Sequence, residues 1–433
     1  MACNLFLLIN LIIITVSSTE EPAPVEPGQR LIKLSVNEPA KWMSEQELGQ
    51  LLKEHGPLGF LDLTLKGDDS APTQNKALYT YPSGPLQSTV VRKLFPYLKK
   101  DRMESFVRKM SSFPSRFSRH FTGPGYADDW LIQEIASVLG NRQTKEGHSP
   151  MRRVYSPDLH AGVGIPRRKY TAPTIIVTLD GEDPLKKELI ILGAHYDSIN
   201  GPYHPILDDE GAAVTETKVA PGADDNATGC AVLLEVLRLL VQFGIKLKYT
   251  LEFHWYAAEE MGNLGSGQIA YDYFREKKLE VYAMLNLDVI GYRSDKHAKT
   301  IAYSNDGTNQ ELTTFLKMLS KEYVEYGMTE RPCKAGCFSD HDAWNQSGYP
   351  AAFFTEAELT PFIHTEKDTI ETVNFEQVNE FAKLAVAFVI ELGELSEIPS
   401  IPDPEASLAS SLSKSAWLWT AMWLLGGASA AGM

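Results

Sequence analysis

The chain has 433 residues, a length that suggests two or three domains, and 43% of them are hydrophobic, as in a globular protein with a sizeable core. Its formal net charge of −15 and the lack of a long basic run exclude a nucleic-acid-binding protein, because phosphate contacts need clustered Lys and Arg. No internal repeat is visible in the sequence.

The N-terminus predicts export from the cell. Residues 5–16 are almost wholly apolar, with the length of a signal-peptide core, and small residues suited to cleavage follow at 17–19. No Lys or Arg precedes this segment, so a transmembrane anchor is the alternative, although the run is short for a span. We expect residues 1–18 to be a signal peptide and the protein to be secreted into an oxidising environment.

Residues 19–90 have the layout of a detachable prosegment and its linker. Alternating apolar residues predict strands at 31–36 and 60–65. Between them, Ser44 and Glu47 form a capping box at the start of a helix. We therefore expect a small α+β unit ahead of the main domain.

Strands and helices alternate over residues 91–395, the expected main domain. We expect strands at 174–179, 188–194, the start of 249–267, 281–287, 300–303 and 349–355, and helices at 103–112, 128–139, 226–242, up to about 276, 309–326 and 375–392. This alternation predicts an α/β fold of three layers, with a mixed, mostly parallel sheet between helices. Ligands of such sheets collect at the carboxyl ends of the strands.

Ionisable side chains follow two of these strands. His195 and Asp197 come after the strand at 188–194 and lie two residues apart, which places them on one face of an extended chain. We expect Asp197 to orient and polarise the His195 ring, as carboxylates beside metal-binding histidines do. Glu259 and Glu260 end the central strand and, being adjacent, point to opposite sides, so they are expected to have different tasks.

Five side chains at strand ends form a candidate metal site. They are His195, Asp224, Glu260, Asp288 and His364. Two imidazoles and three carboxylates without a thiolate suit catalytic zinc, with cobalt or manganese as substitutes. Three carboxylates carry too much negative charge for one metal ion but suit two ions. Each ion would then have one histidine and one terminal carboxylate, and Asp224 would bridge the two ions. Glu259 is then free to act as the general base that takes a proton from water.

The cysteines and one sequon give further expectations. Cys333 and Cys337 are four residues apart in a loop, and their spacing allows a small disulfide ring. Cys230 lies in an apolar helical pattern and is expected to be a buried free thiol. Asn345 opens the glycosylation sequon Asn-Gln-Ser.

The C-terminal residues 396–433 form a linker and an apolar tail. Proline predicts a stiff linker at 397–404, small residues follow at 406–415, and residues 416–433 carry no charged side chain. This order is typical of a lipid-anchor signal that is removed on attachment, although the polar spacer is short. A cell-surface-anchored form and a freely secreted form therefore both stay open.

The ordered motifs resemble the secreted di-zinc leucyl aminopeptidases of bacteria and fungi. The matching motifs lie at 193–198, 221–229, 258–260, 286–291, 363–365 and 368–369, within a resemblance that covers roughly residues 100–393. The resemblance implies the zinc exopeptidase fold, Asp224 between two zinc ions, and His195 and Glu260 on separate ions. It also implies a cis peptide bond between Asp224 and Asp225.

The same resemblance implies properties of the surrounding segments. Cys333 and Cys337 match a family disulfide beside the substrate pocket, and Ala335 stands where some members carry an aromatic residue that assists the substrate. Residues 30–65 resemble the prosegment of fungal members, an intramolecular chaperone or inhibitor. The loop at 200–219 has no assigned role.

The predicted function is removal of the N-terminal residue from peptides with a free amino terminus, and the resemblance implies an apolar first residue, above all leucine. Val289, Phe353 and Ile363 are apolar at matching positions and are candidate walls of its pocket. The alternatives are a carboxypeptidase, a single-zinc glutaminyl cyclase and a non-catalytic binding domain, and the complete ligand set favours the aminopeptidase. We expect a monomer after removal of the prosegment.

Overall fold

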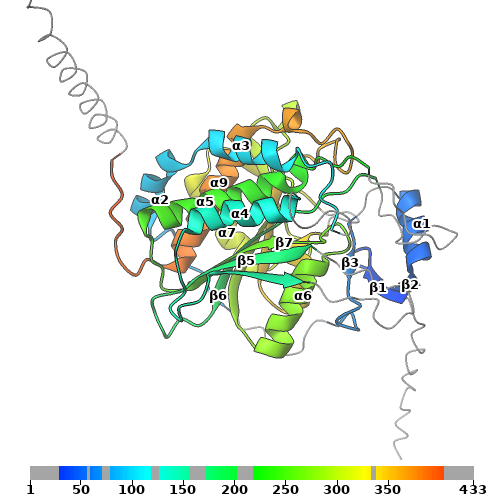
Figure 1. The fold of residues 1–433 in the computed structure, drawn as a ribbon, viewed down its shortest axis with the longest axis horizontal. Coiled ribbons are helices and arrows are strands. Elements are labelled where there is room, and N and C mark those ends of the chain that lie inside the picture. The colour runs from blue at the N-terminus through cyan, green and yellow to red at the C-terminus, as the bar shows by residue number, and fades with distance from the viewer. Residues whose placement is uncertain are drawn as a thin grey trace, which may run out of the picture.

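A computed structural model gives the structure of the chain. It describes residues 29–55, 59–70, 79–118, 126–155, 172–201, 218–332 and 338–403 (Figure 1). The expected signal peptide, the apolar C-terminal tail, the two loop cysteines Cys333 and Cys337, Ala335 and most of the loop at 200–219 lie outside these residues.

A single large sheet forms the centre of the main domain, with the strand order β10-β9-β11-β8-β6-β7-β5-β4. Its strands are β4 (Met151–Tyr155), β5 (Pro173–Leu179), β6 (Leu189–His195), β7 (Thr250–Tyr256), β8 (Val281–Leu287), β9 (Thr300–Ser304), β10 (Gly327–Glu330) and β11 (Ala351–Glu356). The central strands β7, β6, β8 and β11 run parallel, whereas β4 and β5 at one edge and the β9–β10 pair at the other introduce antiparallel pairings. The predicted mixed, mostly parallel sheet is confirmed.

Helices cover both faces of this sheet and complete the three layers (Figure 1). One face carries α2 (Ser88–Leu94), α3 (Lys100–Met110), α4 (Ala127–Leu139), α5 (Thr228–Phe243), α7 (Gln310–Tyr323) and α9 (Phe375–Gly393). The other face carries α6 (Leu264–Asp272) and α8 (Asp340–Gln346). Short helical turns occupy Phe95–Tyr97, Ala223–Ala227, Tyr273–Lys277, Asp295–His297 and Ile370–Thr372.

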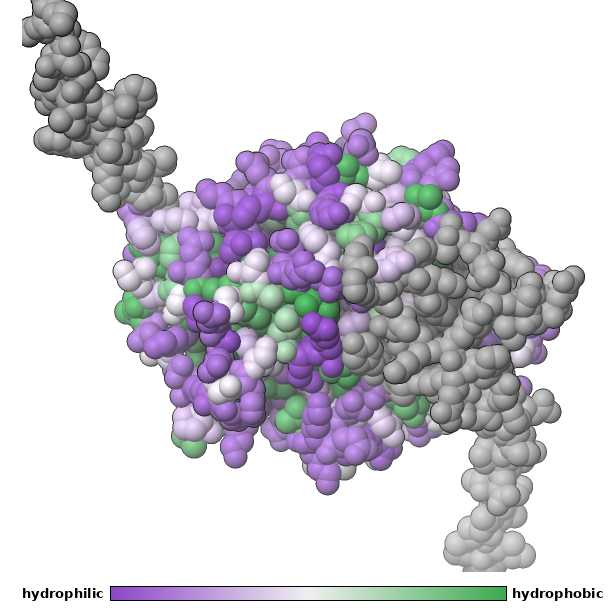
Figure 2. Space-filling model, in the orientation of Figure 1, coloured by the Kyte–Doolittle hydropathy of each residue, from purple (hydrophilic) through white to green (hydrophobic). Residues whose placement is uncertain are grey.

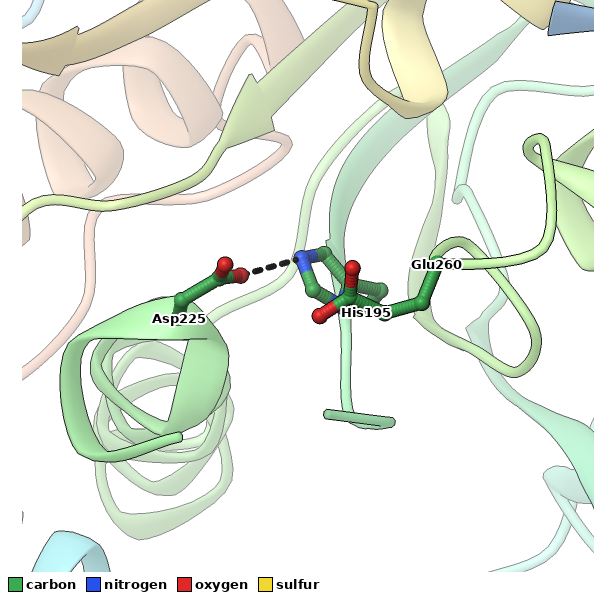
Figure 3. A group of neighbouring side chains, drawn as sticks. All are labelled: His195, Asp225 and Glu260. Atoms are coloured by element: carbon green, nitrogen blue, oxygen red, sulfur yellow. Dashed lines mark ion pairs between the residues drawn. The ribbon is translucent and has the colours of Figure 1, made fainter. Parts of the chain in front are cut away.

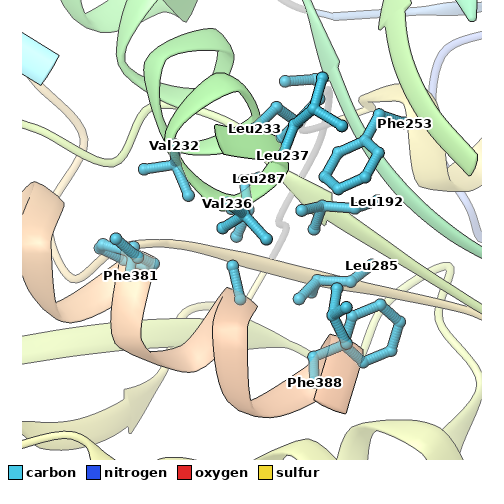
Figure 4. Close-up of a cluster of buried hydrophobic side chains, with 14 of the residues drawn as sticks. Leu192, Val232, Leu233, Val236, Leu237, Phe253, Leu285, Leu287, Phe381 and Phe388 are labelled. Carbon is cyan, nitrogen blue, oxygen red and sulfur yellow. The ribbon is translucent and has the colours of Figure 1, made fainter. Parts of the chain in front are cut away.

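The core lies where α5 and α9 pack on the sheet. Figure 4 shows Leu192, Phe253, Leu285 and Leu287 of the sheet against Val232, Leu233, Val236 and Leu237 of α5 and Phe381 and Phe388 of α9. Each such fully buried side chain contributes roughly 1.5–3 kcal/mol. Among the described residues, the segment Ala223–Phe243 is long and apolar enough to cross a membrane, but 78% of its apolar window is buried, as expected of a core helix.

The outward faces of the helices are polar. Figure 2 shows that hydrophilic side chains dominate the face of the molecule on which α3 and α4 lie, with hydrophobic residues scattered between them. The helix α3 shows the cause, because Met103, Phe106, Val107 and Met110 are buried at helical spacing while polar, mostly charged residues fill the positions between them.

A small α+β unit precedes the main domain, and we call its described residues 29–55 and 59–70 the N-terminal unit. It contains β1 (Gln29–Lys33), β2 (Lys41–Ser44), α1 (Glu45–His55) and β3 (Leu61–Asp62), with the antiparallel strand order β2-β1-β3. The predicted capping box is present, because the backbone N–H of Ser44 donates to Glu47 Oε2 at 2.7 Å and the N–H of Glu47 donates to Ser44 Oγ at 3.2 Å. Its removal as a prosegment stays a prediction.

The sequon residue Asn345 lies within α8 and is engaged by the fold. Its side-chain nitrogen donates to the backbone oxygens of Gly307 (2.6 Å), His341 (3.3 Å) and Ala351 (3.2 Å). A glycan on this nitrogen would disrupt these bonds inside a packed region. The structure therefore argues against glycosylation at Asn345.

Candidate metal centre

Three neighbouring parallel strands bring ionisable side chains to one edge of the sheet. His195 is the last residue of β6, Asp288 follows β8 directly, and Glu260 lies in the turn after β7. The pairing of β6 with both β7 and β8 aligns these carboxyl ends, as predicted for parallel strands.

The side chains of this edge converge on the carboxylate of Asp225. Asp225 Oδ1 lies 3.2 Å from Nε2 of His195, and Oδ2 lies 3.1 Å from Nε2 of His364. Asp288 Oδ1 is 3.1 Å from the same His195 nitrogen, and Glu260 Oε2 is 3.0 Å from the same His364 nitrogen. Figure 3 shows Asp225 projecting from the start of the α5 region toward His195, with Glu260 beside the ring. Each imidazole therefore has its own carboxylate, and Asp225 lies between the two.

The structure does not bring Asp224 into this cluster, so its predicted position between the two histidines is wrong. Its Oδ1 accepts the backbone N–H of Gly291 at 2.6 Å, and its Oδ2 accepts that of Tyr292 at 2.9 Å. The cis peptide bond is also one residue later than expected, between Asp225 and Asn226. Adjacent side chains leave the backbone in different directions, so only one of the two aspartates faces the histidines.

The charges in the cluster favour a bound cation. Burial alone would lower the pKa of His195 and His364, but the surrounding carboxylates outweigh it and hold both pKa values well above the ordinary range. Burial acts to raise the pKa of Asp225, yet hydrogen bonds from the two imidazoles hold it below its ordinary value. The cluster thus stabilises positive charge among its side chains.

The residues present fit zinc. Atoms of His195, Asp225 and Glu260 that can bind a metal all lie within 4.8 Å of one another. Glu260 Oε1 is buried and has no hydrogen-bond partner in the described part of the chain, a need that a metal ion meets. Imidazole nitrogen and carboxylate oxygen are the ligands typical of catalytic zinc.

Comparisons with known proteins agree with this geometry. The model of "Peptidase family M28" matches residues 174–389. A "Probable leucine aminopeptidase" of Arthroderma otae is 32% identical over 379 residues, covering 86% of this chain and 94% of the relative. The chain belongs to peptidase family M28. This membership confirms the predicted resemblance and the predicted enzyme class, a zinc-dependent aminopeptidase.

Further comparisons show the extent of the likeness. "Leucine aminopeptidase 1" of Trichophyton equinum is 31% identical over 384 residues, covering 86% of this chain and 94% of the relative. The crystal structure of the LapA aminopeptidase of Legionella pneumophila superimposes with a TM-score of 0.65 at 24% identity, covering 86% of this chain and 99% of that chain. The latter likeness confirms the predicted fold class.

Asp368 and Asn226 fix the segment that carries the central carboxylate of this M28 chain. The Asp368 carboxylate accepts the backbone N–H groups of Asp224 at 2.9 Å and Asp225 at 3.1 Å. The Asn226 side chain donates to the Leu287 carbonyl oxygen at 2.9 Å, at the end of β8. The sequence placed Asp368 and Asn226 in motifs but did not indicate these roles, because they depend on contacts between distant segments.

Asp197 links the first histidine to the segment after β7, residues 257–263, which we call the acidic turn. Asp197 is fully buried, and its Oδ1 lies 3.4 Å from Nδ1 of His195. Its two carboxylate oxygens accept the backbone N–H groups of Glu259 at 3.1 Å and Glu260 at 3.3 Å. Asp197 is therefore placed to hold both the imidazole and the two glutamates.

Glu259 lies near the cluster but belongs to neither imidazole–carboxylate pair, His195 with Asp288 or His364 with Glu260. Its Oε2 lies 4.0 Å from Nε2 of His195. Burial raises the pKa of Glu259 well above its ordinary value, and His195 opposes this shift, while the charges of Glu260, Asp288 and Asp340 add to it. A carboxylate with a raised pKa accepts a proton more readily than an ordinary glutamate, which suits proton transfer.

Ser339, at the start of α8, supports the Asp288 side of the site. Its Oγ donates to Asp288 Oδ2 at 2.7 Å and accepts from Asn286 Nδ2 at 2.8 Å. Sequence reasoning missed this residue, although its place as the helix N-cap, with Asp342 closing a capping box, is a signal that was available.

The remaining predicted residues have varied positions. Val289 follows Asp288 and is buried, with a φ of 44°, and the half-buried Ile363 precedes His364. Phe353 is buried, and its ring stacks on His341 with centroids 4.5 Å apart. Cys230 is a buried free thiol, as predicted, and its Sγ donates to the His195 carbonyl oxygen at 3.0 Å.

Proposed function

We propose that this M28 chain removes an apolar N-terminal residue, leucine above others, from peptides with a free amino terminus. The observation that carries the proposal is the Asp225 carboxylate, which presents one oxygen to each imidazole. Such a carboxylate would be able to serve two zinc ions. His195 and Asp288 would hold one ion, and His364 and Glu260 would hold the other. The names of the fungal relatives support the preference for leucine.

In the proposed reaction, bound zinc, Glu259 and Asp197 have separate roles. Bound zinc ions supply Lewis acidity, which lowers the pKa of a water molecule and polarises the scissile carbonyl group. Glu259 takes the proton from the attacking water and returns it to the leaving amine. Asp197 keeps the His195 ring oriented and holds the backbone of both glutamates, as its contacts support.

The proposal includes a pocket that binds the side chain of the substrate's N-terminal residue. Val289 and Ile363 are apolar and adjoin Asp288 and His364 in the chain, so they are the best-supported walls. Phe353 has a weaker claim, because its ring already stacks on His341. An apolar pocket would favour leucine over charged first residues.

Export from the cell completes the proposal. The apolar segment at residues 5–16 would direct secretion, and the uncharged tail at 416–433 would allow anchoring at the cell surface. Cys333 and Cys337 would then meet conditions in which a disulfide persists. The secreted enzyme would act as a monomer on extracellular peptides.

The test compares leucine p-nitroanilide with its N-acetylated form, before and after treatment with a zinc chelator. We expect the full chain to cleave only the free-amine substrate, because an aminopeptidase must recognise the amino group. Chelation should abolish this activity, and added zinc should restore it.

Two results would count against the proposal. Equal cleavage of the acetylated substrate would show that the free amine is not recognised and would indicate another kind of peptidase. Zinc binding without cleavage of aminoacyl anilides, tested with several first residues, would favour a non-catalytic binding domain.

A further inference from the structure

A buried arginine, Arg116, contacts both of the segments that carry the first histidine and the central carboxylate of the site. It lies between α3 and α4 in the chain and is 2% exposed. Its Nε donates at 2.7 Å to the carbonyl oxygen of Tyr196, the residue between His195 and Asp197. The guanidinium therefore holds the backbone at the end of β6.

The same guanidinium binds the loop that leads to Asp225. Nη2 of Arg116 donates to the carbonyl oxygen of Gly222 at 2.8 Å, and Nη1 donates to that of Pro221. Gly222 has a φ of 52°, in the left-handed region. A Cβ atom at this glycine would come within 2.6 Å of Nη2, so the loop packs directly against the guanidinium. Arg116 thus joins the end of β6 to the loop before Asp225.

Arg116 and Asp368 bind complementary groups of this loop. Arg116 binds the carbonyl oxygens at positions 221 and 222, whereas Asp368 accepts the backbone N–H groups of Asp224 and Asp225. Hydrogen bonds to a charged partner are stronger than those between neutral groups. The place of the Asp225 carboxylate therefore depends on one cation and one anion that hold the loop from different sides.

Ser198 adds a further link between the same segments. Its Oγ accepts the backbone N–H of Arg116 at 3.2 Å and donates to the carbonyl oxygen of Ala220 at 2.8 Å. The backbone N–H of Ala220 donates to the carbonyl oxygen of Pro114 at 2.7 Å. Three segments that are distant in sequence are thereby fixed to one another behind the metal centre.

The charge of Arg116 is unusual for a buried cation. In the described part of the chain no carboxylate forms an ion pair with its guanidinium, whose acceptors are backbone carbonyl oxygens. Burial lowers the pKa of Arg116, whereas the charges of Asp368, Asp197 and Asp225 oppose this shift. Arginine stays protonated in proteins even so. Its positive charge therefore offsets repulsion among the carboxylates around the metal centre.

We propose that Arg116 is a positioning residue that sets the place of Asp225 relative to His195 and thereby the fit of zinc between them. Asp225 Oδ1 and His195 Nε2 are 3.2 Å apart, and the guanidinium binds the backbone next to both residues. The inference rests on the proposed function, because it assumes that the Asp225 carboxylate serves the zinc ions. Arg116 acts through the backbone and does not touch the substrate.

The first test replaces Arg116 by lysine in the full chain and measures zinc affinity by competition with a chromogenic chelator. Lysine keeps the positive charge but lacks the planar set of donors that reaches several carbonyl oxygens. Arg116→Lys should weaken zinc binding about 10–100-fold and lower kcat for leucine p-nitroanilide, as changes behind metal ligands do. The control is Arg102→Lys, which alters an arginine bound to Glu235 and to the Tyr97 carbonyl oxygen, and it should change neither quantity.

Amide hydrogen exchange of the zinc-free protein gives a measurement that depends on neither activity nor metal. The backbone N–H of Ala227 donates to the Gly222 carbonyl oxygen at 3.2 Å, and those of Asp224 and Asp225 donate to Asp368. Arg116→Lys should speed exchange over residues 222–227 and leave the distant strand β9 unchanged. A merely destabilised fold would speed exchange in β9 as well, and that result would overturn the proposal.

Zinc affinity and exchange that are equal in the Arg116→Lys and Arg102→Lys variants would also overturn it, whatever the effect on kcat. If Arg116→Lys does not fold, Ser198→Ala decides, because it removes one link between the same segments and leaves Arg116 in place. Ser198→Ala should weaken zinc binding about two- to tenfold, and unchanged binding would contradict the proposal. A wild type that binds zinc but does not cleave the anilide would instead count against the proposed function, and zinc affinity and exchange would still decide the role of Arg116.

Discussion

Replacing Glu259 by glutamine is expected to lower kcat for leucine p-nitroanilide by about 10³–10⁴-fold. Glutamine keeps the size of the side chain and the backbone bond to Asp197, but it cannot accept a proton. Because Glu259 belongs to neither imidazole–carboxylate pair, the variant should bind as much zinc as the wild type and show a similar KM. Steady-state kinetics and the zinc content of the purified protein provide the measurement.

A matched control separates this effect from a general loss of charge. Glu358 is an exposed glutamate in the segment between β11 and His364, and Glu358→Gln should leave kcat unchanged. If Glu259→Gln retained more than about a tenth of wild-type kcat, the proton would have to move through another group.

The second large effect distinguishes the two adjacent aspartates. Asp225→Asn should lower kcat by about 10³-fold or more and reduce the zinc content, because several kcal/mol of transition-state stabilisation depend on the metals that Asp225 would join. Asp224→Asn should retain zinc. Its main effect should be a loss of stability of about 1–3 kcal/mol, because the Asp224 carboxylate accepts buried N–H groups from Gly291 and Tyr292.

The pair is informative because the two substitutions are chemically identical and one residue apart. Zinc content and thermal unfolding should be measured on both variants. We expect the larger loss of zinc in Asp225→Asn and the loss of stability as the main effect in Asp224→Asn. Loss of zinc in Asp224→Asn with retention in Asp225→Asn would restore the interpretation drawn from the sequence and contradict the geometry of the structure.

The sequence predicted the centre of the fold better than its edges. Buried strands such as β6 and β8 are continuous apolar runs, and their alternation with amphipathic helices indicates a parallel sheet. The edge strands β4 and β10 were missed, as were the short helices α2 and α8. Edge strands pair on one side only and carry mixed residues, such as the two arginines of β4, so their pattern is weak.

The candidate site was predictable in composition but not in detail. The order of His195, Glu260, Asp288 and His364 along a strand–helix alternation was enough to bring them together. The choice between Asp224 and Asp225 was not, because it depends on the backbone geometry of one turn and on the N–H groups of Gly291 and Tyr292, which are distant in sequence and bind the Asp224 carboxylate. The contacts of Arg116 with the loop before Asp225 have the same origin, since they join residues 105 and 106 positions apart.

The position of bound zinc tests the central claim most directly. Crystals of the full chain prepared with zinc, measured at the zinc absorption edge, should show two anomalous peaks, one on each side of the Asp225 carboxylate. One peak should lie beside His195 and Asp288, and the other beside His364 and Glu260. A single peak, or a peak beside Asp224 in place of Asp225, would contradict the two-zinc arrangement proposed here.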